Sequence, residues 1–182
     1  VPGPNFTRLY GHQFGTNERP FVVVVPVSGA PAALVPNLEL NGFAALNFEG
    51  EVFDWRDQTG YGDAFKALAA HMPLKSLAVE GQSMRVFVQL ALTGATPGLR
   101  IVDGETAITG LRYRKTPDEI AAMTRAIAIS EAALGETLDR VRIGQSEKDI
   151  ERMLVQSLYA HGAEEQAFGA LVAAGAATAA AH

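Results

Sequence analysis

The amino-acid sequence predicts an α/β domain, with a mixed sheet flanked by helices, followed by an incomplete α+β domain. Strand patterns alternate with helix patterns up to residue 102, as in layered α/β domains. A basic stretch and a strong helix start after Gly110 indicate a new domain. Beyond this point the sequence offers only two helices and one strand, which are too few to bury a core. We therefore assign 1–110 to a first domain and 111–182 to the truncated start of a second.

The composition is that of a globular chain without a strong charge bias. The 182 residues are 48% hydrophobic with a formal net charge of −5, so we expect no general attraction to nucleic acid or anionic membranes. The absence of cysteine excludes disulfides, zinc–thiolate sites and thiol nucleophiles, and agrees with a cytoplasmic location. No apolar run approaches the ~20 residues of a membrane span. Because Val1-Pro2-Gly3-Pro4 contains neither an initiating Met nor a signal-peptide pattern, we expect the sequence to begin inside a longer chain.

The first elements follow from short apolar runs and the turn residues between them. A short strand is expected at Phe6–Tyr10, followed by a polar loop over 11–19. The run Pro20–Pro26 is the clearest strand because it is β-branched, and its two apolar faces predict a central position in the sheet. Ser28–Pro31 is a turn, which makes 32–35 the hairpin partner of that strand.

The rest of the first domain continues the alternation. Asp63 is expected to cap one helix, which ends at His71, and Ser83 another, which Thr93-Gly94 ends. The expected elements are, in order, a helix over 38–47, a strand over 51–55, a helix over 63–71, a strand over 76–79, a helix over 84–92 and a strand over 99–102.

The long helix after the domain boundary has a well-defined start. Thr116 is expected as its N-cap, with the Glu119 carboxylate bonding back to the Thr116 amide in a capping box. Pro117 is placed at the first helical position, where its missing N–H costs nothing. Apolar residues then recur at three- and four-residue steps, so one face should pack inward: Ile120, Met123, Ile127, Leu134, Leu138 and Val141.

A second helix and one strand complete the expected elements. After Gly144, Ser146 and Asp149 are spaced to cap a helix that ends at His161-Gly162. Ala167–Val172 is expected as a strand. The alanine-rich tail that follows cannot pack by itself, so we expect truncation at this end too.

Few side chains suggest chemistry by themselves. Phosphate-binding loops, the His-Glu-x-x-His helix and the Gly-x-Ser-x-Gly elbow are absent. His71 and His161 are each expected at a helix C-terminus, where the helix dipole favours a cation, and we prefer this role to a catalytic one. Glu164 and Glu165 could hold a metal, although adjacent exposed carboxylates are more often a solvated pair.

Two further charged groups have alternative roles. Asp54 and Asp57 flank Trp55-Arg56, and we favour an arginine partner over a general acid–base pair. The basic group at the domain boundary could bind a phosphate, although contacts with neighbouring carboxylates are favoured: Arg112, Arg114 and Lys115.

Several short segments, each weak alone, occur in a specific order along nearly the whole chain. They are Pro2-Gly3-Pro4-Asn5, Tyr10-Gly11, Glu18-Arg19-Pro20, Pro36-Asn37-Leu38-Glu39, Val79-Glu80-Gly81-Gln82-Ser83-Met84-Arg85, Leu111-Arg112 with Lys115-Thr116-Pro117-Asp118-Glu119-Ile120, Gly144-Gln145-Ser146-Glu147 with Ile150, and finally Phe168, Val172, Gly175 and His182. In this order they resemble the creatinase/prolidase family of pita-bread metallopeptidases, which includes aminopeptidase P and Xaa-Pro dipeptidases. The segment from Leu111 to Ile120 resembles the entry to the catalytic domain.

The resemblance implies a creatinase-type N-terminal domain followed by the opening of a pita-bread domain. It implies a homodimer acting on proline-containing peptides, with two divalent metal ions (Mn, Co or Zn) whose ligands lie beyond this chain. His182 alone maps to a functional position, as a catalytic substrate contact that stabilises charge near the scissile carbonyl. Ala177 stands where the family often has Asn, and Ala181 where Pro commonly precedes the histidine.

The resemblance leaves three functions open. The first is hydrolysis of peptide bonds before proline by a metallopeptidase of which this chain, inactive alone, is a fragment. The second is hydrolysis of a small amide, as in creatinase or ectoine-hydrolysing enzymes. The third is a non-catalytic interaction module, because a histone-chaperone subunit carries a peptidase-like domain without its metal ligands. Sequence beyond His182 distinguishes them, since five intact ligands favour the enzymes.

Overall fold

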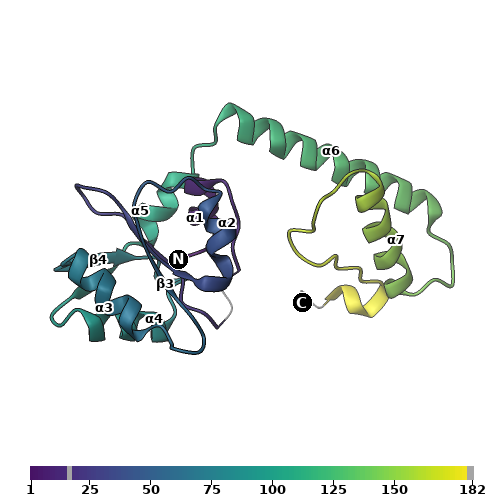
Figure 1. The fold of residues 1–182 in the computed structure, drawn as a ribbon. Helices are drawn as coiled ribbons and strands as arrows, with labels where there is room; N and C mark the ends of the chain where they lie inside the picture. The colour runs from purple at the N-terminus through teal and green to yellow at the C-terminus, as the bar shows by residue number, and fades with distance from the viewer. Residues whose placement is uncertain (16–17, 180–182) are drawn as a thin grey trace. The chain divides into compact units, whose positions relative to one another are not determined.

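The computed structural model describes residues 1–15 and 18–179. The chain forms two compact units, Val1–Arg114 and Lys115–His182, which can be followed separately in Figure 1. Within the described residues, no helix combines the length and apolar character needed to cross a membrane.

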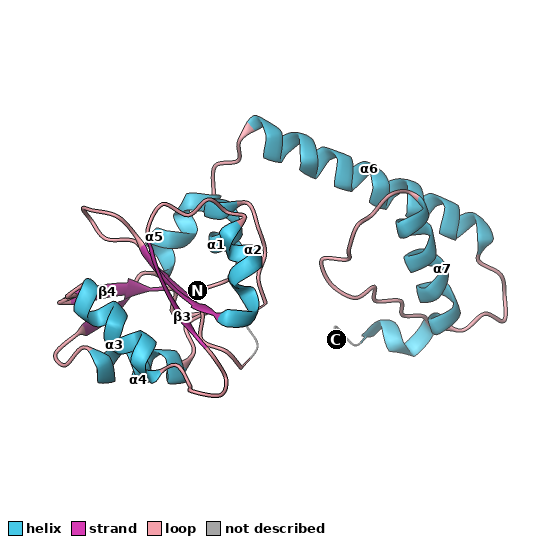
Figure 2. Cartoon of the chain, in the orientation of Figure 1, coloured by secondary structure: helices cyan, strands magenta, loops and turns pink. Residues whose placement is uncertain are grey.

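The first unit is built on a three-stranded mixed sheet and a two-stranded parallel sheet, whose strands are drawn in magenta in Figure 2. β2 (Ala32–Pro36) pairs antiparallel with β1 (Val22–Val24) and parallel with β3 (Glu51–Trp55). β4 (Ser76–Val79) pairs parallel with β5 (Arg100–Asp103). The predicted α/β class with a mixed sheet is confirmed.

The expected central position of the valine-rich strand is wrong. The sheet order is β1-β2-β3, so β2 is central and β1 lies beside it at the edge. β1, the other strand of the hairpin, pairs with one edge of β2, and β3 pairs with the other edge. The burial pattern agrees, because all five residues of β2 are buried whereas Val23 in β1 is only half-buried.

Helices surround these strands in the first unit. They are α1 (Pro4–Tyr10), the 3-10 turn η1 (Asn37–Glu39), α2 (Leu40–Ala44), α3 (Gly62–His71), α4 (Val86–Ala95), α5 (Glu105–Thr109) and the 3-10 turn η2 (Gly110–Arg112). The helix expected over 38–47 is thus shorter and begins as a 3-10 turn. Asp63 lies inside the first turn of α3 rather than capping it, and Ser83 precedes the true N-cap of α4, Arg85.

The prediction of a strand at Phe6–Tyr10 is wrong, because this segment belongs to helix α1. Phe6 and Tyr10 lie one helical turn apart, and their ring centroids are 4.8 Å from each other. Pro4 occupies the first turn, and Gly11 ends the helix in a left-handed conformation with φ of 70°. A short apolar run cannot by itself distinguish a strand from a helix.

The central strand β2 divides the core of the first unit into two clusters. Ala32 and Leu34 contact one cluster, to which α3 and α4 contribute Phe65, Leu68, Val88 and Leu92. Ala33 and Val35 contact the other, which is rich in aromatic rings: Phe6, Phe14, Phe21 and Phe43. Alternate residues of a strand point to opposite faces, so both faces of β2 are covered by apolar side chains.

A polar network ties the two ends of the first unit together. The buried Asn5 donates from Nδ2 to Glu80 Oε1 at 2.8 Å, and its Oδ1 accepts from Arg112 Nε at 2.6 Å. Arg112 is thus tied to α1 through an amide oxygen, and the favoured carboxylate contacts of the basic group stay a prediction.

The second unit contains α6 (Pro117–Arg140), α7 (Glu147–Ala160) and the 3-10 turn η3 (Gly175–Ala179). Both predicted capping boxes are confirmed: Thr116 Oγ1 accepts from the Glu119 amide at 3.3 Å, and Ser146 Oγ from the Asp149 amide at 3.2 Å. The strand expected at Ala167–Val172 does not form. A strand needs a neighbour for its N–H and C=O groups, and the part of the second unit that the structure describes has no strand.

Replacing Thr116 by alanine should destabilise α6 by about 1 kcal/mol, because the Glu119 amide would lose its acceptor. Urea unfolding followed by circular dichroism measures this as a lower midpoint. Thr124→Ala is the matched control, since Thr124 lies exposed within α6 and its hydroxyl donates to the Ile120 carbonyl. An unchanged midpoint for Thr116→Ala would mean that the cap does not stabilise the helix.

Candidate functional site

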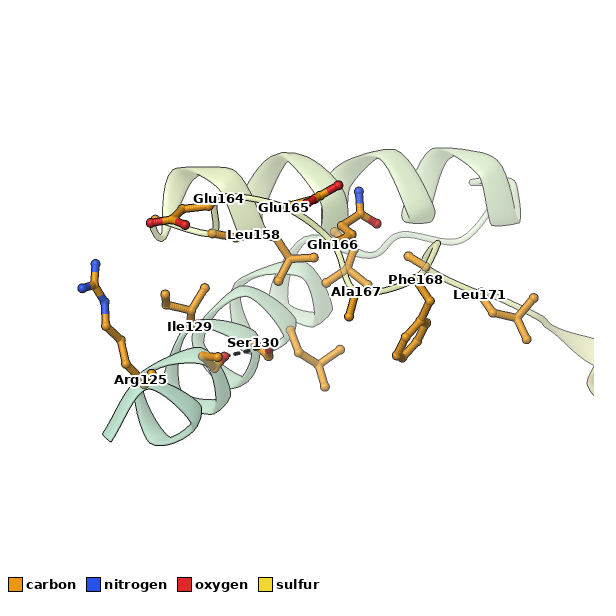
Figure 3. Close-up of a pocket in the computed structure, with 17 residues that line it drawn as sticks. Arg125, Ile129, Ser130, Leu158, Glu164, Glu165, Gln166, Ala167, Phe168 and Leu171 are labelled. Carbon is orange, nitrogen blue, oxygen red and sulfur yellow. Dashed lines mark hydrogen bonds between the residues drawn. The ribbon is translucent and has the colours of Figure 1, made fainter. Parts of the chain in front are cut away.

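An apolar groove of about 780 Å³ lies in the second unit. α6 and α7 form two walls, and the segment 162–171 forms a third (Figure 3). The lining is mostly apolar, with Ile129, Leu158 and Phe168 among its residues. The charged residues of its lining are Arg125, Glu164 and Glu165, so the groove is apolar with few charged groups.

The polar groups of the groove do not form a catalytic set. Ser130 donates from Oγ to the Ala126 carbonyl at 2.9 Å, as the dashed line in Figure 3 shows, and is thereby held to its own helix. Glu164 and Glu165 are both exposed. Across residues 1–15 and 18–179, no group of three or more His, Asp or Glu side chains is arranged to hold a metal ion.

The two carboxylates near Trp55 do not form an acid–base pair. Asp57 pairs with Arg19, with 2.6 Å between Nη2 and Oδ2, and the Arg19 hydrogen bond lowers the pKa of Asp57. Arg19 also contacts Glu18 at 2.6 Å. The favoured arginine partner is therefore present for Asp57, but it comes from 38 residues away rather than from the neighbouring Arg56.

The two helix-terminal histidines have different surroundings. His71 is the last residue of α3, and its ring centroid lies 5.6 Å from that of Phe53. His161 follows α7 as its C-cap, and its Nε2 lies 3.1 Å from Glu136 Oε2 on α6. The sequence reasoning missed Glu136, because no local pattern relates it to a partner 25 residues later.

Glu136 is a hub between α6 and α7. Its Oε2 also accepts from Ser157 Oγ at 2.5 Å, and its Oε1 lies 3.2 Å from Arg140 Nη1. The hydrogen bond from Ser157, then that from His161, lowers the pKa of Glu136, while partial desolvation opposes this effect. Ser157 is 3% exposed, so this carboxylate satisfies a buried hydroxyl.

The segment leading to the predicted catalytic residue is described up to Ala179. The Ala174 amide donates to Glu147 Oε1 at 2.7 Å, which ties this segment to the first turn of α7. Gly175, with φ of 57°, then begins η3. His182 lies outside the described residues, and so does Ala181.

Comparison with known proteins identifies the family. Residues 6–114 match the Creatinase/Prolidase N-terminal domain, and residues 121–182 match Metallopeptidase family M24. The two matches describe a chain with a creatinase-type domain followed by peptidase sequence. Since the first match covers more than half of the sequence, the chain belongs to the creatinase/prolidase family.

Individual relatives extend the likeness across both units. The probable dipeptidase PepE of Mycobacterium tuberculosis is 28% identical over 171 residues, which cover 92% of this chain and 45% of that protein. The crystal structure of prolidase from Thermococcus sibiricus gives a TM-score of 0.81 at 26% identity, covering 92% of this chain and 46% of that one. Dipeptidase PepE from Mycobacterium ulcerans gives 0.77 at 26% identity, covering 92% and 45%.

The chain therefore spans about half the length of the curated relatives it matches. The likeness confirms the predicted family and the predicted fold, a prolidase-type N-terminal domain with the start of a pita-bread domain.

Proposed function

We propose that the chain is part of a metal-dependent peptidase that hydrolyses the peptide bond before a proline. The observation that carries this proposal is the continuous likeness to a prolidase, over 92% of the chain and across both units. In this proposal 1–110 is the creatinase-type N-terminal domain and 111–182 the start of the catalytic domain.

Two divalent metal ions, Mn, Co or Zn, belong to the proposal for the longer protein. The described residues do not fit such a centre, because they contain no cluster of three or more carboxylate and imidazole ligands. Divalent ions in hydrolases polarise carbonyls and activate water. The proposal assigns their ligands to sequence outside this chain.

The proposed role of this chain in the reaction is substrate positioning. The proline nitrogen in the scissile bond belongs to a tertiary amide without an N–H, so recognition depends on the shape of the pocket. His182 is proposed to donate to the scissile carbonyl oxygen as negative charge develops there. A homodimer, in which the N-terminal domain of one subunit shapes the other's active site, and a cytoplasmic location complete the proposal.

The experiment is a substrate comparison with the longer protein in the presence of Mn²⁺. Ala-Pro should be hydrolysed with a kcat/KM at least about tenfold above that for Ala-Ala, because a pocket fitted to the proline ring discriminates by about 1–3 kcal/mol. Creatine and ectoine are included in the same assay. Hydrolysis of either, without Ala-Pro hydrolysis, would replace the proposal by a small-amide hydrolase, and no hydrolysis at all would favour an interaction module.

A further inference from the structure

The contact between Glu136 and His161 lies next to one wall of the groove. Glu136 is on α6, and His161 is the C-cap residue of α7. The segment 162–171, which begins immediately after His161, forms one wall of the apolar groove. Any force that holds His161 against α6 therefore also holds the base of this wall.

Three donors converge on the Glu136 carboxylate. Ser157 and His161 both contact Oε2, at 2.5 and 3.1 Å, whereas Arg140 contacts Oε1 at 3.2 Å. The Ser157 contact does not depend on the charge of His161, so it keeps the carboxylate in place. The imidazole then has a fixed anionic partner whether or not it carries a proton.

We propose that Glu136 and His161 form a pH-sensitive latch, which fastens the end of α7 and the base of segment 162–171 to α6 when the imidazole is protonated. Two features of the site attract an imidazole that carries a proton. The carboxylate supplies a negative charge at hydrogen-bonding distance, and the C-terminal end of α7 supplies the negative end of the helix dipole. This inference does not rest on the proposed peptidase function.

The neighbouring charges do not change over the same pH range. Arg140 and Arg142 stand near the end of α6, with Arg142 donating to the Asp139 and Val141 carbonyls. Glu164 and Glu165 follow His161 in the wall segment. Arginine and carboxylate side chains ordinarily keep their charges between pH 5.5 and 8, while an imidazole ordinarily loses its proton near pH 6.5.

The sign of the effect follows from the two partners. Ionised Glu136 is required, and because its pKa is lowered from 4.5, the carboxylate stays charged throughout a mildly acidic range. The latch is therefore strong at about pH 5.5 and weakens as the imidazole loses its proton toward pH 8. It is lost again only when more acidic conditions protonate Glu136.

Hydrogen exchange on the whole chain tests the latch. Protection of amides in 157–171 is measured for the wild type and for His161→Gln at pH 5.5 and pH 8, and the ratio of the two proteins is taken at each pH so that intrinsic rates cancel. We expect the protection of the wild type to be about two- to fivefold higher than that of His161→Gln at pH 5.5, which is the range for an exposed ion pair. At pH 8 the two proteins should be equally protected. The side chains of His161 and Glu136 are 38% and 44% exposed, which sets this modest size.

Two further variants make the result decisive. Glu136→Gln keeps an oxygen acceptor for Ser157 but removes the charge. Adding His161→Gln to this variant should therefore not change the protection of amides in 157–171 at either pH. His71→Gln changes the other helix-terminal histidine, which is in the first unit, and should leave 157–171 unaffected. Equal ratios at pH 5.5 and pH 8 for the wild type against His161→Gln, or an undiminished pH effect in Glu136→Gln, would overturn the latch.

Discussion

Replacing His182 by alanine in the longer protein should lower kcat by about 100-fold or more, with the metal content unchanged. The proposed imidazole contact strengthens as charge develops on the scissile carbonyl oxygen. Loss of one such donor costs about two to three orders of magnitude in kcat in enzymes that stabilise an oxyanion. Because the contact is made mainly in the transition state, KM should change much less than kcat.

Metal content measured on the same samples separates the possible roles of His182. His71→Ala is the control, because His71 ends a helix of the first unit and has no proposed contact with substrate. Loss of bound metal in His182→Ala would make this residue a ligand rather than a substrate contact. An unchanged kcat would leave this chain without a proposed catalytic residue.

Replacing Phe65 by alanine should destabilise the first unit by about 3–5 kcal/mol, the usual cost of removing a buried phenylalanine ring. Phe65 is 1% exposed in α3 and packs in the cluster that also holds Trp55, Leu68 and Val88. Truncation leaves a cavity beneath the three-stranded sheet, and a well-packed core relaxes only partly around it.

Urea unfolding of the two variants measures this cost. The same change at Phe168, which is 83% exposed, is the matched control and should alter the free energy of unfolding by less than about 0.5 kcal/mol. Similar losses at the two positions would show that the Phe65 ring is not part of a tightly packed core.

Features that depend on neighbouring residues could be predicted from the sequence. The capping boxes at Thr116 and Ser146 are local, because each joins a side chain to a backbone amide three residues later. The strand at Glu51–Trp55 and the end of α3 at His71 were likewise given by local patterning and are confirmed.

Features that depend on distant residues could not be predicted in this way. β1 lies at the edge because β3 pairs with the other side of β2. β3 begins more than 25 residues after β1 ends. The hub at Glu136 joins residues 21 and 25 positions apart. The prediction for Pro4–Tyr10 was wrong for a different reason. Its seven residues are too few for a periodic pattern to distinguish a helix from a strand.

The predicted catalytic residue and the groove have different sources. The family resemblance supplied His182, whose geometry lies outside the described residues. The groove between α6, α7 and 162–171 emerged only from the structure, because its lining comes from three separate segments. The exposed carboxylates Glu164 and Glu165 border this groove, but no cluster of ligands accompanies them among the described residues.

The most direct test of the central proposal compares the 182-residue chain with the longer protein in one assay. Ala-Pro hydrolysis and bound Mn²⁺ are measured for both, against a control with Mn²⁺ alone. The account predicts hydrolysis and two bound divalent ions per subunit for the longer protein, and neither for the 182-residue chain. Turnover by the 182-residue chain above the Mn²⁺ control, or a longer protein that neither binds metal nor cleaves Ala-Pro, would contradict it.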